Sequence, residues 1–453
     1  MERSEKIGIE KTSKLLVSYS IPAIVGMLVQ ASYNVIARIF IGNNIGFLGI
    51  AGITVAFPVM MVQLAFGFMV GMGATTLVSI RLGEKKKEEA ELVIGNTVIL
   101  LIIISLLITV VGLIFIDPML KLFGASDVVL PYAREYLSII LLGTVLGLIG
   151  FGMNNFLRAE GNPQKAMVTM LIGSFTNMIL TPVFLGVFHW GMKGAAIATI
   201  ISQAVSAIWI VSHFALGKGE LKVRKKNFKL AHRIVGRIIY LGLSPFAMML
   251  SQSLLGGLIN VSLKTYGGDI AISAMGVVTT LMSLIIMPIM GISSGAQPLI
   301  GYNFGAKKFD RVKEVLKYSI IAATALAVLG FVITRIFPTQ LIAVFNSQDA
   351  QLIELGSRAM LIFLILLPIV GFQIVGSGYF QAVGKPIHSL VLGMSRQVLI
   401  FIPALLILPR FLGLDGVFIA GPISDLISTM LTGAFLFVEI KQLDRKHLEG
   451  LAV

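Results

Sequence analysis

Apolar residues follow one another in long stretches that recur from one end of the chain to the other, with short polar connections between them. A helix needs about 20 such residues to cross the hydrocarbon core of a membrane. The pattern therefore predicts an all-α, polytopic membrane protein. The twelve predicted spans are 15–41, 48–79, 91–116, 132–157, 164–188, 193–215, 237–263, 270–300, 315–337, 353–381, 387–409 and 414–438.

The sequence motifs at the ends of these spans occur twice, at an offset of about 222 residues that holds along the whole chain. Gly73-Ala74-Thr75 returns as Gly295-Ala296-Gln297, and Ala159-Glu160-Gly161-Asn162-Pro163 returns as Ala382-Val383-Gly384-Lys385-Pro386. Each copy holds six spans, an even number, so both copies enter the membrane in the same direction. The predicted architecture is two six-helix lobes related by a pseudo-two-fold axis along the membrane normal.

The repeat also predicts the domain organisation. We expect an N-terminal six-helix lobe over 1–216, a basic cytoplasmic linker over 217–236, a C-terminal six-helix lobe over 237–440 and a cytoplasmic tail over 441–453. The linker is long enough to act as a tether that lets the lobes move.

Composition and charge support the membrane assignment. The chain is 56% hydrophobic and 13% charged, with a mean hydropathy of +0.93. The net charge of +14 is unevenly placed. When residues at the ends of spans are counted with the nearest connection, 27 of the 36 Lys and Arg residues belong to the termini and the even-numbered connections, and only 7 to the odd-numbered ones. This bias predicts a multi-pass protein of the cell membrane with both termini in the cytoplasm. The basic run 222–229 then contacts anionic membrane lipids, and we expect no nucleic-acid partner.

Two kinds of local feature have alternative interpretations. The connection 82–95 and its counterpart beginning at Asp310 have apolar positions at helical spacing beside charges, so each is either an amphipathic interfacial helix or an extension of the next span. Prolines interrupt several spans, and Pro22 and Pro245 are candidate hinges of an alternating-access cycle. A fixed kink that aids packing is the alternative.

The motifs and their order resemble the multidrug and toxic compound extrusion (MATE) family of transporters, in its prokaryotic branch. The resemblance covers nearly the full length and rests on the duplicated spans, on Arg158-Ala159-Glu160-Gly161-Asn162-Pro163 and on Gly301-Tyr302-Asn303-Phe304-Gly305-Ala306. It implies a secondary active efflux transporter that works as a monomer. Such a transporter exports amphipathic, cationic drugs or metabolites in exchange for protons or sodium ions, and it needs no cofactor beyond that H⁺ or Na⁺.

The resemblance also implies a polar substrate cavity in the first lobe. Polar side chains at membrane depth are costly when they face lipid, so they should face a wet interior or bond between helices. By position in this sequence the cavity residues are Gln30, Tyr33, Asn34, Asn154, Met170, Ser174, Asn177 and Thr199.

The chain departs from the family at the positions that would couple transport to ions. Related members carry an aspartate in spans one and five, where this chain has Ala37 and Thr181. A carboxylate desolvated at mid-membrane can bind and release a proton, whereas alanine and threonine cannot titrate. Asp425 is an acid well inside span twelve, and Arg396 of span eleven is its expected partner at similar depth. The pair is either a structural ion pair or the coupling site.

Two other function classes remain as alternatives. A flippase for lipid-linked precursors would share the repeat plan, but it usually has a strongly cationic central cavity. An integral membrane enzyme would need clustered acids, histidines or a nucleophile beside a base. The five histidines lie at or near span ends without metal-ligand spacing, so we do not expect an enzyme.

Overall fold

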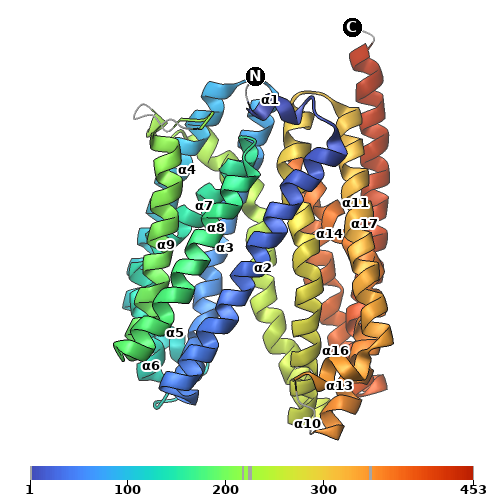
Figure 1. Ribbon diagram of the computed structural model, residues 1–453. Helices are drawn as coiled ribbons and strands as arrows, with labels where there is room; N and C mark the ends of the chain where they lie inside the picture. Colours follow the sequence, from blue (N-terminus) through green and yellow to red (C-terminus); the bar gives the residue numbers. More distant parts are fainter. Residues whose placement is uncertain (1–2, 217–218, 223–226, 346–348, 452–453) are drawn as a thin grey trace. The chain divides into compact units, whose positions relative to one another are not determined.

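The apolar stretches form helices because a backbone surrounded by lipid must satisfy its hydrogen bonds within each segment. The computed structural model describes residues 3–216, 219–222, 227–345 and 349–451, excluding the side chains of Arg3, Asn34, Ser253 and 446–451 (Figure 1). Within these ranges the regular structure is entirely helical.

The first sequence repeat contains ten helical elements. They are α1 (Arg3–Ile7), α2 (Thr12–Ile45), α3 (Phe47–Gly83), α4 (Lys87–Ile114), α5 (Ile116–Leu122), α6 (Leu130–Leu142), α7 (Thr144–Ala159), α8 (Pro163–Pro182), the π-helical turn η1 (Val183–Val187) and α9 (Gly191–Ala215). Helix α3 packs against α4, α6 and α7, and α8 packs against α9. Buried side chains such as Leu120, Leu137 and Leu141 form part of the apolar core.

The second repeat follows the same order. Its elements are α10 (His232–Gly305), α11 (Phe309–Ile336), α12 (Pro338–Ala343), α13 (Ala350–Phe363), α14 (Leu367–Ala382), α15 (Pro386–Met394), the π-helical turn η3 (Ser395–Leu399), α16 (Phe401–Leu412) and α17 (Leu414–Leu451). Helix α14 packs against α11 and α17, and α16 packs against α17. Met360 and Phe418 are fully buried in its core.

The helices account for all twelve predicted spans. In the part of the chain that the structure describes, nine helices are long and apolar enough to cross a membrane, and two bent pairs raise the number to eleven. Helix α10 counts once among these, although it is 74 residues long and contains Gly268 at φ 70°. Because a positive φ interrupts the helical path, α10 contains two spans joined at Gly268. The twelve-helix, two-lobe prediction is therefore confirmed.

Two predicted spans are bent at matching places in the two repeats. Helices α6 and α7 meet at 57° around Gly143, and α13 and α14 meet at 52° just before Pro368. The connections after spans two and eight continue into the spans that follow them. Residues from Lys87 and from Phe309 begin α4 and α11 directly, so the helical-extension alternative is the one observed.

The residues divide by their contacts into two compact units that differ from the predicted lobes in two segments. The first unit is Met1–Glu10 with Val25–Met249, and the second unit is Lys11–Ile24 with Leu250–Val453. The start of α2 thus packs with the second unit, and the start of α10 packs with the first. We had expected each lobe to be one continuous piece of sequence.

Each unit includes a helix segment from the other sequence repeat, and this exchange places the start of α2 in the second unit and the start of α10 in the first. Glycines at repeat-related positions permit the close contacts that these two segments make. In the first unit, a Cβ on Gly73 of α3 would lie 2.2 Å from the Ile238 carbonyl oxygen and 2.8 Å from the Gly242 nitrogen of α10. In the second unit, a Cβ on Gly295 would lie 2.9 Å from the Ser20 nitrogen of α2. Only glycine allows two helix backbones to approach this closely.

The connection between the repeats is fastened to the first unit and does not hang free where it is described. Leu221 is fully buried, the Lys222 amide donates to Glu91 Oε1 at 3.2 Å, and the Ala231 amide donates to Asn96 Oδ1 at 2.7 Å. Residues 223–226, which include the basic Arg224, Lys225 and Lys226, lie outside the described residues. The described part of the predicted linker is therefore bonded to the first unit, and its role as a tether that lets the lobes move stays a prediction.

Candidate functional site

The first unit contains a buried network of amide and hydroxyl groups between α8 and α9. Asn177 Nδ2 donates to Thr199 Oγ1 and to Ser202 Oγ, each at 3.3 Å. Thr181, one helical turn after Asn177, donates from Oγ1 to Asn177 Oδ1 at 3.1 Å. Asn177 and Thr181 are each 2% exposed. The network is uncharged, and each of these contacts joins one donor to one acceptor.

Tyr136 of α6 joins this network. Its side chain hydrogen-bonds with Thr199, and Tyr33 and Arg38 of α2 lie within electrostatic range of it. Tyr136 is 6% exposed, so burial and this bond fix its hydroxyl. Sequence reasoning missed both Tyr136 and Ser202. Tyr136 lies near the start of the predicted span four, next to the charged residues Arg134 and Glu135, and no sequence pattern marked it as a site residue.

The other predicted cavity residues lie on the helices expected of them. Met170 Sδ lies 3.7 Å from Arg158 Nη2, and a Cβ on Gly26 of α2 would come within 2.6 Å of the same sulfur. Asn154 of α7 is 8% exposed, and its Oδ1 has no hydrogen-bond donor among the described residues. Ser174 is buried, Gln30 and Tyr33 are half-buried on α2, and the side chain of Asn34 lies outside the described residues.

The structure brings Asn177, Thr181, Thr199 and Tyr136 into one network. Met170 contacts a different polar group, the guanidinium of Arg158, which is 4% exposed. Ala37 is half-buried on α2 and offers no polar side-chain atom. Thr181 takes part only as a hydroxyl. Hence neither position where the family has an acid supplies a charge in this chain.

The second unit contains the predicted ion pair. Arg396 Nε donates to Asp425 Oδ1 at 2.7 Å, between η3 and α17. The side chains are 21% exposed for Arg396 and 10% for Asp425. The Ser424 hydroxyl donates to the Arg396 carbonyl, and Ser428 Oγ donates to the Asp425 carbonyl at 3.2 Å. The partner predicted for Asp425 from depth alone is confirmed as a contact.

The local backbone positions Arg396 for this contact. Span eleven is α-helical up to Met394, π-helical from Ser395 to Leu399 and α-helical again from Phe401. A π-helical turn widens the helix, leaves backbone groups less regularly bonded and is often found at functional positions. The Arg396 carbonyl is bonded by the Ser424 side chain, which ties the irregular turn to α17. No comparable signal in the sequence marks this turn.

This chain is similar to known proteins both in sequence and in the arrangement of its helices. The family model MatE matches residues 22–183 and again 245–406. The multidrug export protein MepA of Staphylococcus haemolyticus is 28% identical over 404 residues, which are 89% of this chain and 88% of that protein.

Solved structures match over nearly their whole length. The MATE multidrug transporter DinF-BH, solved in complex with a ligand, is 38% identical, with a TM-score of 0.90 over 96% of this chain and 98% of that one. A MOP superfamily transporter from Pyrococcus furiosus, described as having a binding pocket of reverse polarity that suggests a different function, is 26% identical with a TM-score of 0.91 over 97% and 98%. The chain is a member of the MatE family of membrane transporters.

Proposed function

We propose that this protein exports amphipathic, cationic small molecules across the cell membrane by alternating access. The observation that carries the proposal is the match over 96% of the chain, at 38% identity, to a structure described as a multidrug transporter. The name of the Staphylococcus relative, a multidrug export protein, supports the direction of transport. We further propose that the protein works as a monomer with both termini in the cytoplasm.

The first-unit residues form the substrate site in this proposal. The amides and hydroxyls of Asn177 and Thr199 are neutral groups that can exchange their bonds to each other for bonds to a ligand. Asn154 Oδ1, which no described residue supplies with a donor, would accept a hydrogen bond from the ligand. The flexible thioether of Met170 suits a pocket that accepts different shapes. The remaining members are Gln30, Tyr33, Asn34 and Ser174.

The second-unit ion pair is the coupling site in this proposal. Asp425 is a buried carboxylate deep inside a span, whereas Ala37 and Thr181 cannot titrate. While Asp425 is bonded to Arg396, the guanidinium balances the charge of the carboxylate. A change of state that separates the pair leaves a buried carboxylate, which then binds a proton or a sodium ion to neutralise its charge. Coupling therefore requires the 2.7 Å contact to break once in each cycle.

The positions of the proposed hinges follow from the points at which α2 and α10 pass from one compact unit to the other. The division falls between Ile24 and Val25 in α2 and between Met249 and Leu250 in α10. Pro22 and Pro245 precede these points by a few residues, and each removes a backbone hydrogen bond from its helix. We propose that α2 and α10 bend there during transport.

Dye efflux from proteoliposomes, with proton and sodium gradients imposed separately, tests the proposal. We expect one of the two gradients to accelerate efflux of a cationic dye in the wild-type protein. Indifference to both gradients would contradict coupled export. Transfer of a fluorescent lipid-linked precursor between leaflets, without dye movement, would favour the flippase alternative.

A further inference from the structure

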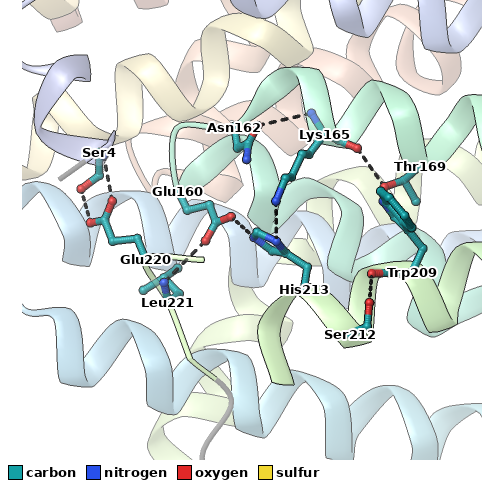
Figure 2. Close-up of polar contacts among 10 residues, drawn as sticks. All are labelled: Ser4, Glu160, Asn162, Lys165, Thr169, Trp209, Ser212, His213, Glu220 and Leu221. Atoms are coloured by element: carbon teal, nitrogen blue, oxygen red, sulfur yellow. Dashed lines mark hydrogen bonds and ion pairs between the residues drawn. The ribbon is translucent and has the colours of Figure 1, made fainter. Parts of the chain in front are cut away.

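A group of three titratable side chains, Glu160 and His213 buried and Lys165 half-buried, lies at the end of the first unit where α8 begins and α9 ends (Figure 2). His213 of α9 lies between the other two, with Nε2 at 2.5 Å from Glu160 Oε1 and Nδ1 at 3.0 Å from Lys165 Nζ. Glu160 is 1% exposed and His213 is 6% exposed. Neither the substrate site nor the coupling pair uses these residues.

The same group holds the connection that joins the two repeats. Glu160 Oε2 accepts from the Leu221 amide at 3.5 Å. A Cβ on Gly219 would lie 2.6 Å from Glu160 Oε2 and 2.8 Å from His213 Nε2, so the backbone at Gly219 covers the pair with no space between. On either side, Glu220 accepts from the Ser4 amide at 2.9 Å and from its hydroxyl, and Glu91 accepts from the Lys222 amide.

The partners define which nitrogen of His213 carries the proton. The Lys165 ammonium has three donors and no acceptor, so it donates to His213 Nδ1. Nδ1 must then be bare, and the single ring proton sits on Nε2 and points at the Glu160 carboxylate. The group has a neutral imidazole between an anion and a cation. Its total charge is zero, which suits its burial.

The second repeat has a different arrangement at the related place. At the 222–223 residue offset Lys165 corresponds to His388 and His213 to Phe435, and these two rings lie 5.5 Å apart at an angle of 77°. The nearby Lys385 binds Glu439 directly, with no imidazole between the charges. The shared fold therefore does not require a histidine between an anion and a cation, which indicates a separate role for His213.

We propose that His213 is a proton-operated latch that holds residues 219–222 on the first unit. A proton on Nδ1 removes the only acceptor that His213 offers Lys165 and places two cations 3.0 Å apart. Glu160 can balance one of them. An unbalanced cation on the buried His213 ring is costly, so water that enters the group relieves the surplus charge. Gly219 seals the pair, so water enters only when this segment lifts.

The groups that face His213 come from the turn before α8, from α8, from its own helix and from the covering segment. Glu160, from the turn between α7 and α8, contacts Nε2 of the ring, and Lys165 of α8 contacts Nδ1. Its own helix contributes the edge of the Phe214 ring, at 5.1 Å. The covering segment contributes Glu220, which is occupied by Ser4 of α1. Acidification of the cytoplasmic side therefore opens the latch.

Hydrogen–deuterium exchange on the full-length protein in nanodiscs tests the latch. Exchange of the Leu221 and Lys222 amides is resolved by fragmentation and corrected for the intrinsic pH dependence of amide exchange. Between about pH 8 and about pH 5.5, the range in which histidine titrates, we expect their exchange to accelerate roughly tenfold or more. The Ala231 amide, which is bonded to the non-titrating Asn96, is the internal control and should not change.

Three variants distinguish the latch from general acid loosening. His213→Gln reproduces the neutral ring, with a donor towards Glu160 and an acceptor towards Lys165, and should keep Leu221 protected at both pH values. Lys165→Met removes the opposing cation and should also keep it protected in acid. His388→Gln, the matched change in the second repeat, should respond to pH as the wild type does. A flat response in the wild type, or an acid response that persists in both His213→Gln and Lys165→Met, overturns the proposal.

Discussion

Arg396 Nε lies 2.7 Å from Asp425 Oδ1, and the two residues are 29 positions apart on neighbouring segments of the second unit. The π-helical turn η3 and two serine hydroxyls on α17 surround the pair. The pair is the buried counterpart of an exposed one on the same helix, where Asp415 binds Arg358. Removing one partner of a buried pair leaves an uncompensated charge, whereas exposed pairs contribute little.

Asp425→Asn should abolish gradient-driven efflux. The amide cannot take up a proton or neutralise a sodium ion, and the largely buried guanidinium of Arg396 loses its counter-charge at a cost of about 3–5 kcal/mol. Efflux from proteoliposomes measures the first effect and thermal unfolding in detergent the second. Asp415→Asn, on the same helix but partly exposed, is the matched control and should transport normally. Wild-type efflux by the folded Asp425→Asn protein would remove the pair from the coupling mechanism.

Thr181→Asp should make the first unit responsive to pH. The new carboxylate would lie about one turn from Asn177, whose amide must rotate so that Nδ2 donates to it. Because the carboxylate is buried, we expect it to exchange protons during transport. The measurement is dye efflux against external pH with and without a proton gradient. Thr181→Asn has a similar size and cannot titrate, so an equal response in both variants would contradict this explanation.

Gly73→Ala and Gly295→Ala should both destabilise the protein. A Cβ at either site meets the backbone of the helix that crosses it, and the helices must move apart. Overpacking of this kind costs about 1–3 kcal/mol. Gly276→Ala in α10 is the control, since nothing described lies within 4 Å of its Cβ position. There we expect a gain of about 0.5–1 kcal/mol from the lower flexibility of the unfolded chain. Equal melting temperatures for all three variants would contradict close helix contact.

Pro22→Ala should slow transport and leave substrate binding intact. Alanine restores the amide that can donate to the Ser18 carbonyl, so α2 becomes stiffer at the proposed hinge. We expect efflux to fall roughly fivefold or more while the dissociation constant stays within about twofold. Fluorescence polarisation of a bound dye gives the second quantity. Pro58→Ala alters a proline inside α3, away from the division between units, and should affect both quantities little.

The sequence was sufficient for the spans and for one long-range contact. Runs of apolar residues identify membrane helices because lipid excludes every alternative, and Asp425 and Arg396 were paired from their depths alone. Bends within the spans are harder to predict from the sequence. Pro368 signals the bend between α13 and α14, but the matching bend at Gly143 has no proline.

The sequence did not predict which residues of different helices contact one another. The buried network of Tyr136 and Ser202 depends on which helix faces α9, and hydropathy does not encode that orientation. Glu160, Lys165 and His213 lie up to 53 residues apart, and each looks like an ordinary polar residue at the end of a span. The start of α2 belongs to the second unit and the start of α10 to the first, and both placements depend on backbone contacts at single glycines. Glycines are common elsewhere in the chain, so these two do not stand out in the sequence.

This exchange means that the duplicated gene does not encode two self-sufficient halves. A fragment ending before 217 would carry residues 11–24 without the helices they pack on, and it would lack 237–249, which complete its own bundle. Separately produced halves should therefore be insoluble alone and recover only when made together. Each half of the sequence therefore depends on the other for the segment that completes its helical bundle.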